Sequence, residues 1–128
     1  MDASHFFSAH EQHPAVFSSE YACPNLKGKS EEYLIKGIRA FIVSLLHWVA
    51  EQGGMVGHIK ALVENGGVHF LSSTGAEIRE TVVSAPVQSR SETAFYVTAI
   101  IFKVSEEKLA AFCGNALSTL AGAVKKPV

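Results

Sequence analysis

The clearest pattern of apolar and polar positions is a pair of β-prone runs joined by Asn65-Gly66. Both residues tolerate the positive φ of a tight turn, so the pattern predicts a hairpin over Val56–Thr74. A two-residue loop pairs Leu62 with His69, whereas a three-residue loop would mix the two faces. With the two-residue loop, one face is apolar and the other carries His58, Lys60 and His69.

Two further segments repeat apolar residues at helical spacing. The first helix begins at Ser30-Glu31-Glu32, where a serine caps an amide and acids suit the positive end of the dipole. It ends at Gly53-Gly54, because glycine accepts the left-handed C-cap geometry. The second begins at Ser105-Glu106-Glu107, and its apolar stripe continues to Val124. The apolar arc of the first helix is broader than one packing surface needs.

Two more strands are expected between the hairpin and the second helix. Glu77–Ser84 alternates weakly, and Thr93–Val104 is a long run of aromatic and β-branched residues. Both sides of Thr93–Val104 are apolar, while a strand with one wet face has one polar side. We therefore expect both of its faces to be covered.

The element order after the first 29 residues is helix, four strands, helix. Short connections favour an α+β fold, a two-layer sandwich with an antiparallel four-stranded meander and both helices on one face. Residues 30–128 are expected to form one domain. Residues 1–29 read as an irregular N-terminal arm, with Ala15–Tyr21 as either a short edge strand or part of a flexible tail.

The surplus apolar surface predicts a further partner. A second copy of the chain is favoured, since isologous dimers are the commonest oligomers. The alternative is that the N-terminal arm folds back over the sheet. A formal charge of −1 gives no field to attract nucleic acid or an anionic membrane. The longest apolar stretch, Ile38–Ala50, is interrupted by polar residues and too short to span a bilayer.

The cellular setting is expected to be the cytosol. The first 20 residues contain no basic start followed by an apolar run, so no signal peptide is visible. Two cysteines do not make a disulfide framework and are expected to be reduced thiols. Cys113 lies on the apolar stripe of the second helix, where a buried, inert thiol is expected, and Cys23 is expected in a more exposed loop.

The candidate chemistry lies on the polar side of the hairpin. His58 is two residues from Lys60 and, in the two-residue-loop register, opposite Ser73, which makes a cluster suited to a carboxylate or phosphate. His69 shares this face, but its imidazole is about 13 Å from that of His58, at four strand positions. One metal ion cannot bridge them. The alternative interpretation is a solvated face with ordinary cross-strand pairs.

The N-terminal arm supplies a weaker metal hypothesis. His5, His10 and His13 are suitable ligand types, but they follow no recognised ligand spacing. No cofactor is implied by the sequence.

These observations favour a non-enzymatic homo-oligomeric module, a dimer first, that binds a small molecule or a protein partner. One alternative is a small cofactor-free enzyme in which His58 acts as acid and base, Lys60 anchors an anion and Ser73 assists. That enzyme needs a further carboxylate, such as Glu80 or Glu64, to complete its site. Metal binding by the arm is the other alternative.

Overall fold

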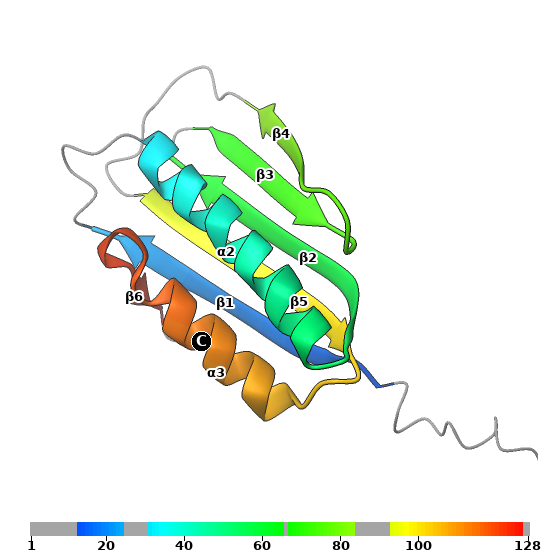
Figure 1. Ribbon diagram of the computed structural model, residues 1–128. Helices are drawn as coiled ribbons and strands as arrows, with labels where there is room; N and C mark the ends of the chain where they lie inside the picture. Colours follow the sequence, from blue (N-terminus) through cyan, green and yellow to red (C-terminus); the bar gives the residue numbers. More distant parts are fainter. Residues whose placement is uncertain (1–12, 25–30, 66, 84–92, 127–128) are drawn as a thin grey trace, which may run out of the picture.

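The computed structural model describes residues 13–24, 31–65, 67–83 and 93–126. One antiparallel sheet carries both α-helices on the same face (Figure 1). In chain order the elements are β1 (Ala15–Cys23), α2 (Glu31–Glu51), β2 (Met55–Glu64), β3 (Val68–Ser73), β4 (Arg79–Val83), β5 (Thr93–Phe102), α3 (Glu106–Leu117), the short 3₁₀ helix η2 (Leu120–Gly122) and β6 (Val124–Lys125). The α+β class, the antiparallel sheet and the two helices are thus confirmed.

The four-stranded meander is wrong. The sheet has six strands in the order β4-β3-β2-β5-β1-β6, so β5 pairs with β2 and β1 instead of β4. The physical reason lies in burial. The doubly apolar β5 gains more between two long strands than beside β4, whose five residues are all exposed. Strands β4 and β5 are neighbours in sequence but do not pair, against the usual tendency of consecutive strands.

Strand β1 lies beside β5 near one edge of the sheet. Its nine residues pair with β5 from Ala15–Ile101 to Cys23–Thr93, whereas on its other side only Tyr21 and Ala22 pair with β6. Ala15–Tyr21 is therefore a strand, and among the described residues most of its outer side lies at the sheet edge. Residues 13–24 of the arm extend the sheet sideways and do not fold over the face opposite the helices, and the rest of the arm lies outside the described residues.

The core lies between the sheet and the two helices. The broad apolar arc of α2 is used within the chain. Leu34, Ile38, Ile42 and Leu45 are each at most 1% exposed, and the Trp48 ring stacks on Phe112 of α3 with centroids 4.9 Å apart. The arc therefore meets α3 as well as the sheet, and gives no separate reason to expect a partner on α2.

By length and composition alone, Glu32–Glu51 meets the criterion for a membrane-crossing helix. This helix is longer than its apolar stretch Ile38–Ala50, which the sequence pattern indicates is too short to span a bilayer. In the described fold, one side of this helix forms the core. A core helix passes the same test of length and composition.

The helix boundaries follow local chemistry. Gly53, at φ 74°, provides the expected left-handed residue after α2, and the Gly54 N–H donates to the Val49 carbonyl at 2.9 Å. At the start of α3, Ser105 Oγ accepts the Lys108 N–H at 3.0 Å, which confirms this cap. The expected cap at Ser30 lies outside the described residues.

Helix α3 ends earlier than expected. The periodic pattern extends to Val124, but the helix stops at Leu117. The hydroxyls of Ser118 and Thr119 donate to the carbonyls of Asn115 and Ala116, at 3.2 and 3.0 Å. Such local bonds compete with helix continuation. The chain then turns through η2 to form β6.

The turn between β5 and α3 contains a strained residue. Lys103 has φ 64°, the left-handed region that favours glycine. We expect Lys103→Gly to raise the free energy of unfolding by about 0.5–1 kcal/mol, after the entropic cost of glycine is subtracted. Urea unfolding measures the change. Lys103→Ala, which removes the side chain but keeps the strain, should give no such gain, and equal gains from both would contradict this explanation.

Candidate functional site

The register between β2 and β3 decides which side chains share a face. Leu62 pairs with Phe70 and Val63 with His69, so three positions, 65–67, separate the paired ends at Glu64 and Val68. The two-residue loop was therefore the wrong choice. A shift of one position moves every β3 side chain to the other face. Phe70 consequently lies on the face opposite the helices, which we call the open face, and His69 lies on the helix face.

The predicted cluster of His58, Lys60 and Ser73 is only partly assembled. His58 and Lys60 lie on the open face, where Lys60 is exposed and His58 half-buried. Ser73 pairs with Ile59 instead of His58 and is 3% exposed; its Oγ accepts the Gly75 N–H at 3.2 Å. The trio therefore does not form one catalytic arrangement.

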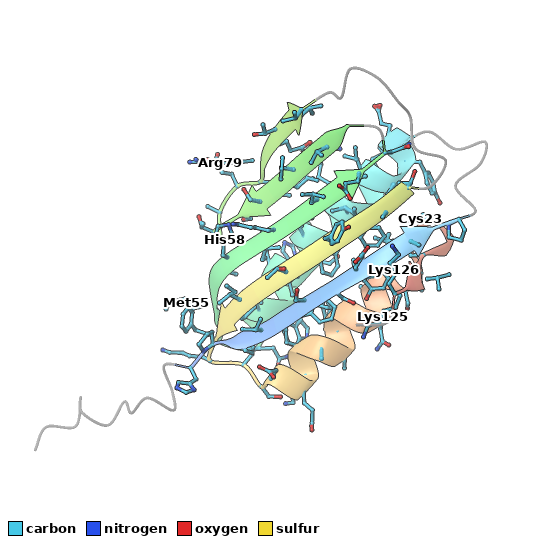
Figure 2. The ribbon with its side chains drawn as sticks, turned by 180° about the vertical axis from the view of Figure 1, so that it is seen from behind. Cys23, Met55, His58, Arg79, Lys125 and Lys126 are labelled. Carbon is cyan, nitrogen blue, oxygen red and sulfur yellow. The ribbon has the colours of Figure 1, made fainter. Side chains whose placement is uncertain are left out.

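Strand β4 contributes the residue that sequence reasoning missed. Arg79 pairs with Ser72, which in turn pairs with Lys60, so the three side chains form a row across the open face. Figure 2 shows His58 and Arg79 at the same side of this face. Only the correct β2–β3 register reveals the row. With the alternative register, Ser72 would point into the core.

The neighbouring row on the open face is apolar. Phe70 pairs with Leu62, and Leu62 with Tyr96 of β5. Phe70 is 42% exposed and Tyr96 36%, while Leu62 is half-buried. Apolar side chains in this number are uncommon on a solvent-facing sheet, where polar residues usually alternate with buried ones.

A surface hollow of about 440 Å³ lies over these two rows. Its walls come from Lys60 and Ser72 of the polar row, from the apolar row, and from the adjacent Thr98 and His58. A second hollow of about 340 Å³ adjoins the first, and both are lined by His58 and Ser72. Arg79 and Glu77 line the second, with 3.9 Å between their charged atoms.

The open face is polarised along its strands. The cations Lys60 and Arg79 lie towards one end together with His58, and Glu20 and Glu64 lie towards the other. Lys126 Nζ donates to Glu20 at 3.0 Å and thereby lowers the pKa of that carboxyl. The pKa of the Tyr96 phenol is raised, first by desolvation and then by these two carboxylates.

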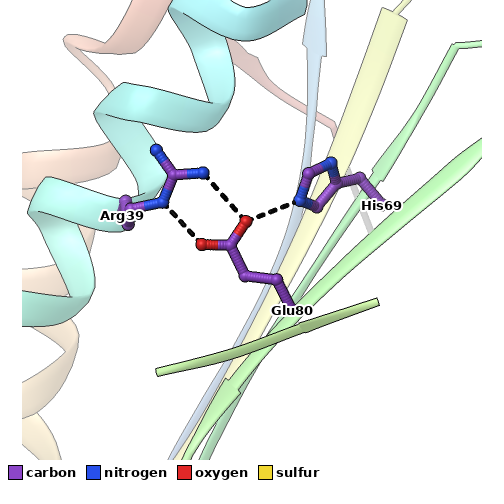
Figure 3. Close-up of polar contacts among 3 residues, drawn as sticks. All are labelled: Arg39, His69 and Glu80. Carbon is purple, nitrogen blue, oxygen red and sulfur yellow. Dashed lines mark hydrogen bonds and ion pairs between the residues drawn. The ribbon is translucent and has the colours of Figure 1, made fainter. Parts of the chain in front are cut away.

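A separate polar cluster lies on the helix face (Figure 3). Arg39 of α2 donates from Nε and Nη2 to the two oxygens of Glu80, at 2.6 and 2.8 Å. His69 Nε2 lies 2.8 Å from the same carboxylate. The bond from Arg39, followed by that from His69, lowers the pKa of Glu80 to about 2. These contacts tie β4 and β3 to α2, and Glu80 is thus not available to assist His58 on the open face.

The other candidate residues do not converge. His5 and His10 lie outside the described residues, and His13 is exposed just before β1. Within the described ranges, no group of three or more His, Cys, Asp or Glu side chains is placed to hold a metal ion. Cys113 is buried, and desolvation raises the pKa of its thiol to about 12, as expected for an inert cysteine. Cys23 was expected in a loop but is 2% exposed at the end of β1.

Comparisons with known proteins are sparse. No protein-family model matches the sequence, and no curated protein matches it significantly. Among solved structures, the fold is similar to the Zn(II)-bound YjiA GTPase from E. coli, with 12% sequence identity and a TM-score of 0.45 over 86% of this chain and 32% of that one. A Zn(II)-bound triple mutant of YjiA GTPase matches with 10% identity and a TM-score of 0.47, over 80% and 30%. The chain thus spans about a third of their length.

The ionised Glu80 makes stability depend on pH. Because its pKa is lowered on folding, its contribution is present above pH 4.5 and is lost as the pH falls towards 2. We expect Glu80→Gln to lower the free energy of unfolding at pH 7 by about 1–2 kcal/mol, allowing for solvent screening of the partly exposed pair. Urea unfolding should show this difference narrowing towards pH 2.

Glu77→Gln is the matched control. Its carboxylate is 3.9 Å from Arg79, and both side chains are more than three-quarters exposed. The control should change stability by less than about 0.5 kcal/mol. A difference between wild type and Glu80→Gln that stays constant from pH 7 to pH 2 would show that the Glu80 contacts are not the cause.

Proposed function

We propose that the protein is a self-associating binding module in which two copies pack through the open faces of their sheets. The observation that carries this proposal is the apolar surface of β5 on that face. Tyr96, Ile100 and Phe102 project there, beside Val16 of β1, which pairs with Ile100. Val16 is 44% exposed and Tyr96 36%. We call these four residues the β5 patch.

The position of the patch supports an interface. Strand β5 lies between β2 and β1, and its helix-side residues, such as Phe95 and Ile101, are fully buried. All five open-face positions of this fully described strand, Ala94, Tyr96, Thr98, Ile100 and Phe102, are uncharged. Interface cores are depleted of charge and enriched in aromatic residues. Covering such a surface gains about 25 cal/mol for each Å² of apolar area removed from water.

Charge favours a second copy as the partner. Lys60 and Glu64 lie at different positions along β2. They follow the separation of positive and negative side chains along the open face. An antiparallel copy related by a two-fold axis across the strands would place each charged end against its opposite. A formal charge of −1 adds little long-range repulsion between copies. Isologous pairing through one shared surface is also the commonest symmetric solution.

A binding role fits the described residues better than catalysis does. Ser73 is 3% exposed and lines the smaller hollow with His58, whereas Lys60 lines the larger one, and Glu80 is held by Arg39 on the other face. The proposed enzyme would need these groups to converge around one reacting atom. The open face instead offers an apolar contact surface beside a hollow with cations on its rim.

Self-association is tested by Val16→Glu, which places a charge in the β5 patch. We expect wild type to elute as a dimer in size-exclusion chromatography with light scattering, and Val16→Glu to weaken the association at least about tenfold, since burying an unpaired carboxylate is costly. Val43→Glu is the matched control. Val43 is 45% exposed on α2, on the opposite side of the molecule, and its substitution should leave the dimer intact.

Circular dichroism of both variants checks that the fold is retained. A wild-type protein that remains a monomer of 13.8 kDa at high concentration would overturn the proposal. Equal association of Val16→Glu and wild type would remove the β5 patch as the contact surface.

A further inference from the structure

The two adjoining hollows combine features that a single ligand could use together. The larger has a volume of about 440 Å³, within the usual range of small-molecule sites. Its lining includes the apolar row Phe70, Leu62 and Tyr96. Lys60 and Ser72 of the polar row lie alongside, together with Thr98, which pairs with Lys60. Apolar walls with a few polar groups at one side are typical of sites that orient a small ligand.

The polar row presents hydrogen-bond donors and positive charge. Lys60 and Arg79 flank Ser72, because Ser72 pairs with Lys60 on β2 and with Arg79 on β4. Neighbouring strands are about 4.8 Å apart, so the two cations come from strands about 10 Å apart with the Ser72 hydroxyl between them. His58 lines both hollows on the same side. Ammonium, guanidinium and hydroxyl groups donate to carboxylate or phosphate oxygens.

The nearby acids leave this side available to an anion. Glu77 is 3.9 Å from Arg79, and both side chains are highly exposed, so this pair is weak. Glu64 lies on the same strand as Lys60, four positions further along and beyond the apolar row. The charge of a ligand that spans both rows is therefore directed towards Lys60, with its apolar part towards Tyr96.

We propose that this hollow binds a small amphipathic anion. A compact carboxylate or phosphate head contacts Lys60 and Ser72, with Arg79 of the adjoining smaller hollow beside Ser72, and a flat apolar body lies against Leu62, Phe70 and Tyr96. All of these groups come from one chain. The site lies on the face through which two copies are proposed to pack and shares Tyr96 with the β5 patch, so the ligand and a second copy compete for this face. The proposed ligand class is an aromatic or aliphatic carboxylate or phosphate.

The test uses three probes that differ in one part each. 4-Phenylbutyrate has both head and body, 4-phenylbutyramide has the same body with a neutral head, and acetate has the head alone. Titration of ¹⁵N-labelled full-length protein, followed by amide chemical shifts, measures affinity and location together. We expect saturable shifts along β2, β3 and β5 with 4-phenylbutyrate, and binding at least about tenfold weaker for the other two.

The source of the negative charge is tested with phenyl phosphate. Saturable binding of either anionic probe at the hollow supports the site, and the tighter one identifies the preferred head. If neither binds, or if the amide binds as tightly as 4-phenylbutyrate, the proposal is overturned. Shifts confined to the α2–α3 side would overturn it as well.

Two variants distinguish a direct contact with the anionic head of the ligand from a general effect of surface charge. Lys60→Gln should weaken 4-phenylbutyrate binding about tenfold, since a charged hydrogen bond is lost. Lys108→Gln removes an exposed cation on α3 and should leave the affinity unchanged. Binding should persist in Val16→Glu, because Val16 does not line the hollow. Absence of binding by monomeric Val16→Glu therefore refutes the site, whereas a wild type that binds the probes but never dimerises refutes only the association.

Discussion

The pairing of Leu62 with Phe70 is the constraint on which the rest of the candidate site depends. In an antiparallel pair, a change of one residue in register exchanges the two faces of a strand. The observed register places Phe70 and Ser72 on the open face, and directs Leu71 and Ser73 into the core. Together with the pairing of Ser72 with Arg79 between β3 and β4, it places Arg79 on the open face and Glu80 on the side of α2.

The two faces of the sheet therefore have different physical roles. The helix face is closed by α2 and α3, and its polar side chains are held in specific contacts, as Glu80 is by Arg39 and His69. The open face contains apolar surface together with charges of both signs. Strand β5 takes part in both faces, because its side chains are apolar on each side. Its central position gives the helix face a buried core and leaves the open face with the β5 patch.

Much of the fold could be predicted from local patterns. Glycine at position 53 and the cap at Ser105 follow from backbone and side-chain chemistry within a few residues. The doubly apolar pattern of Thr93–Val104 predicted a strand covered on both faces; among the described residues only the helix face of β5 is covered, and Tyr96 on the other face is 36% exposed. The strand order could not be predicted, because it depends on competition between distant partners. Nothing local in Ala15–Cys23 shows that β5 will pair with it along its whole length.

The candidate site was less predictable for a related reason. His58 and Lys60 share a face whichever loop joins the hairpin, because they are two residues apart on one strand. Ser73 and His69 depend on the loop length, and one extra residue moved both to the helix face. Arg79 depends in addition on how β3 pairs with β4. Each further strand adds a register choice that short-range sequence signals do not determine.

The exposed strand β4 has a consequence for behaviour in acid. Its outer edge has no partner strand among the described residues, and Glu80 connects its centre to α2. Protonation of that carboxylate would break this contact with the helix while β4 stays paired with β3, before the core between β1, β2 and β5 is disturbed. The loosened outer edge, which bears Val82 and Val83, has backbone groups that can add to a neighbouring molecule's sheet. Strong acidification would thus favour aggregation that begins at one edge of an otherwise folded protein.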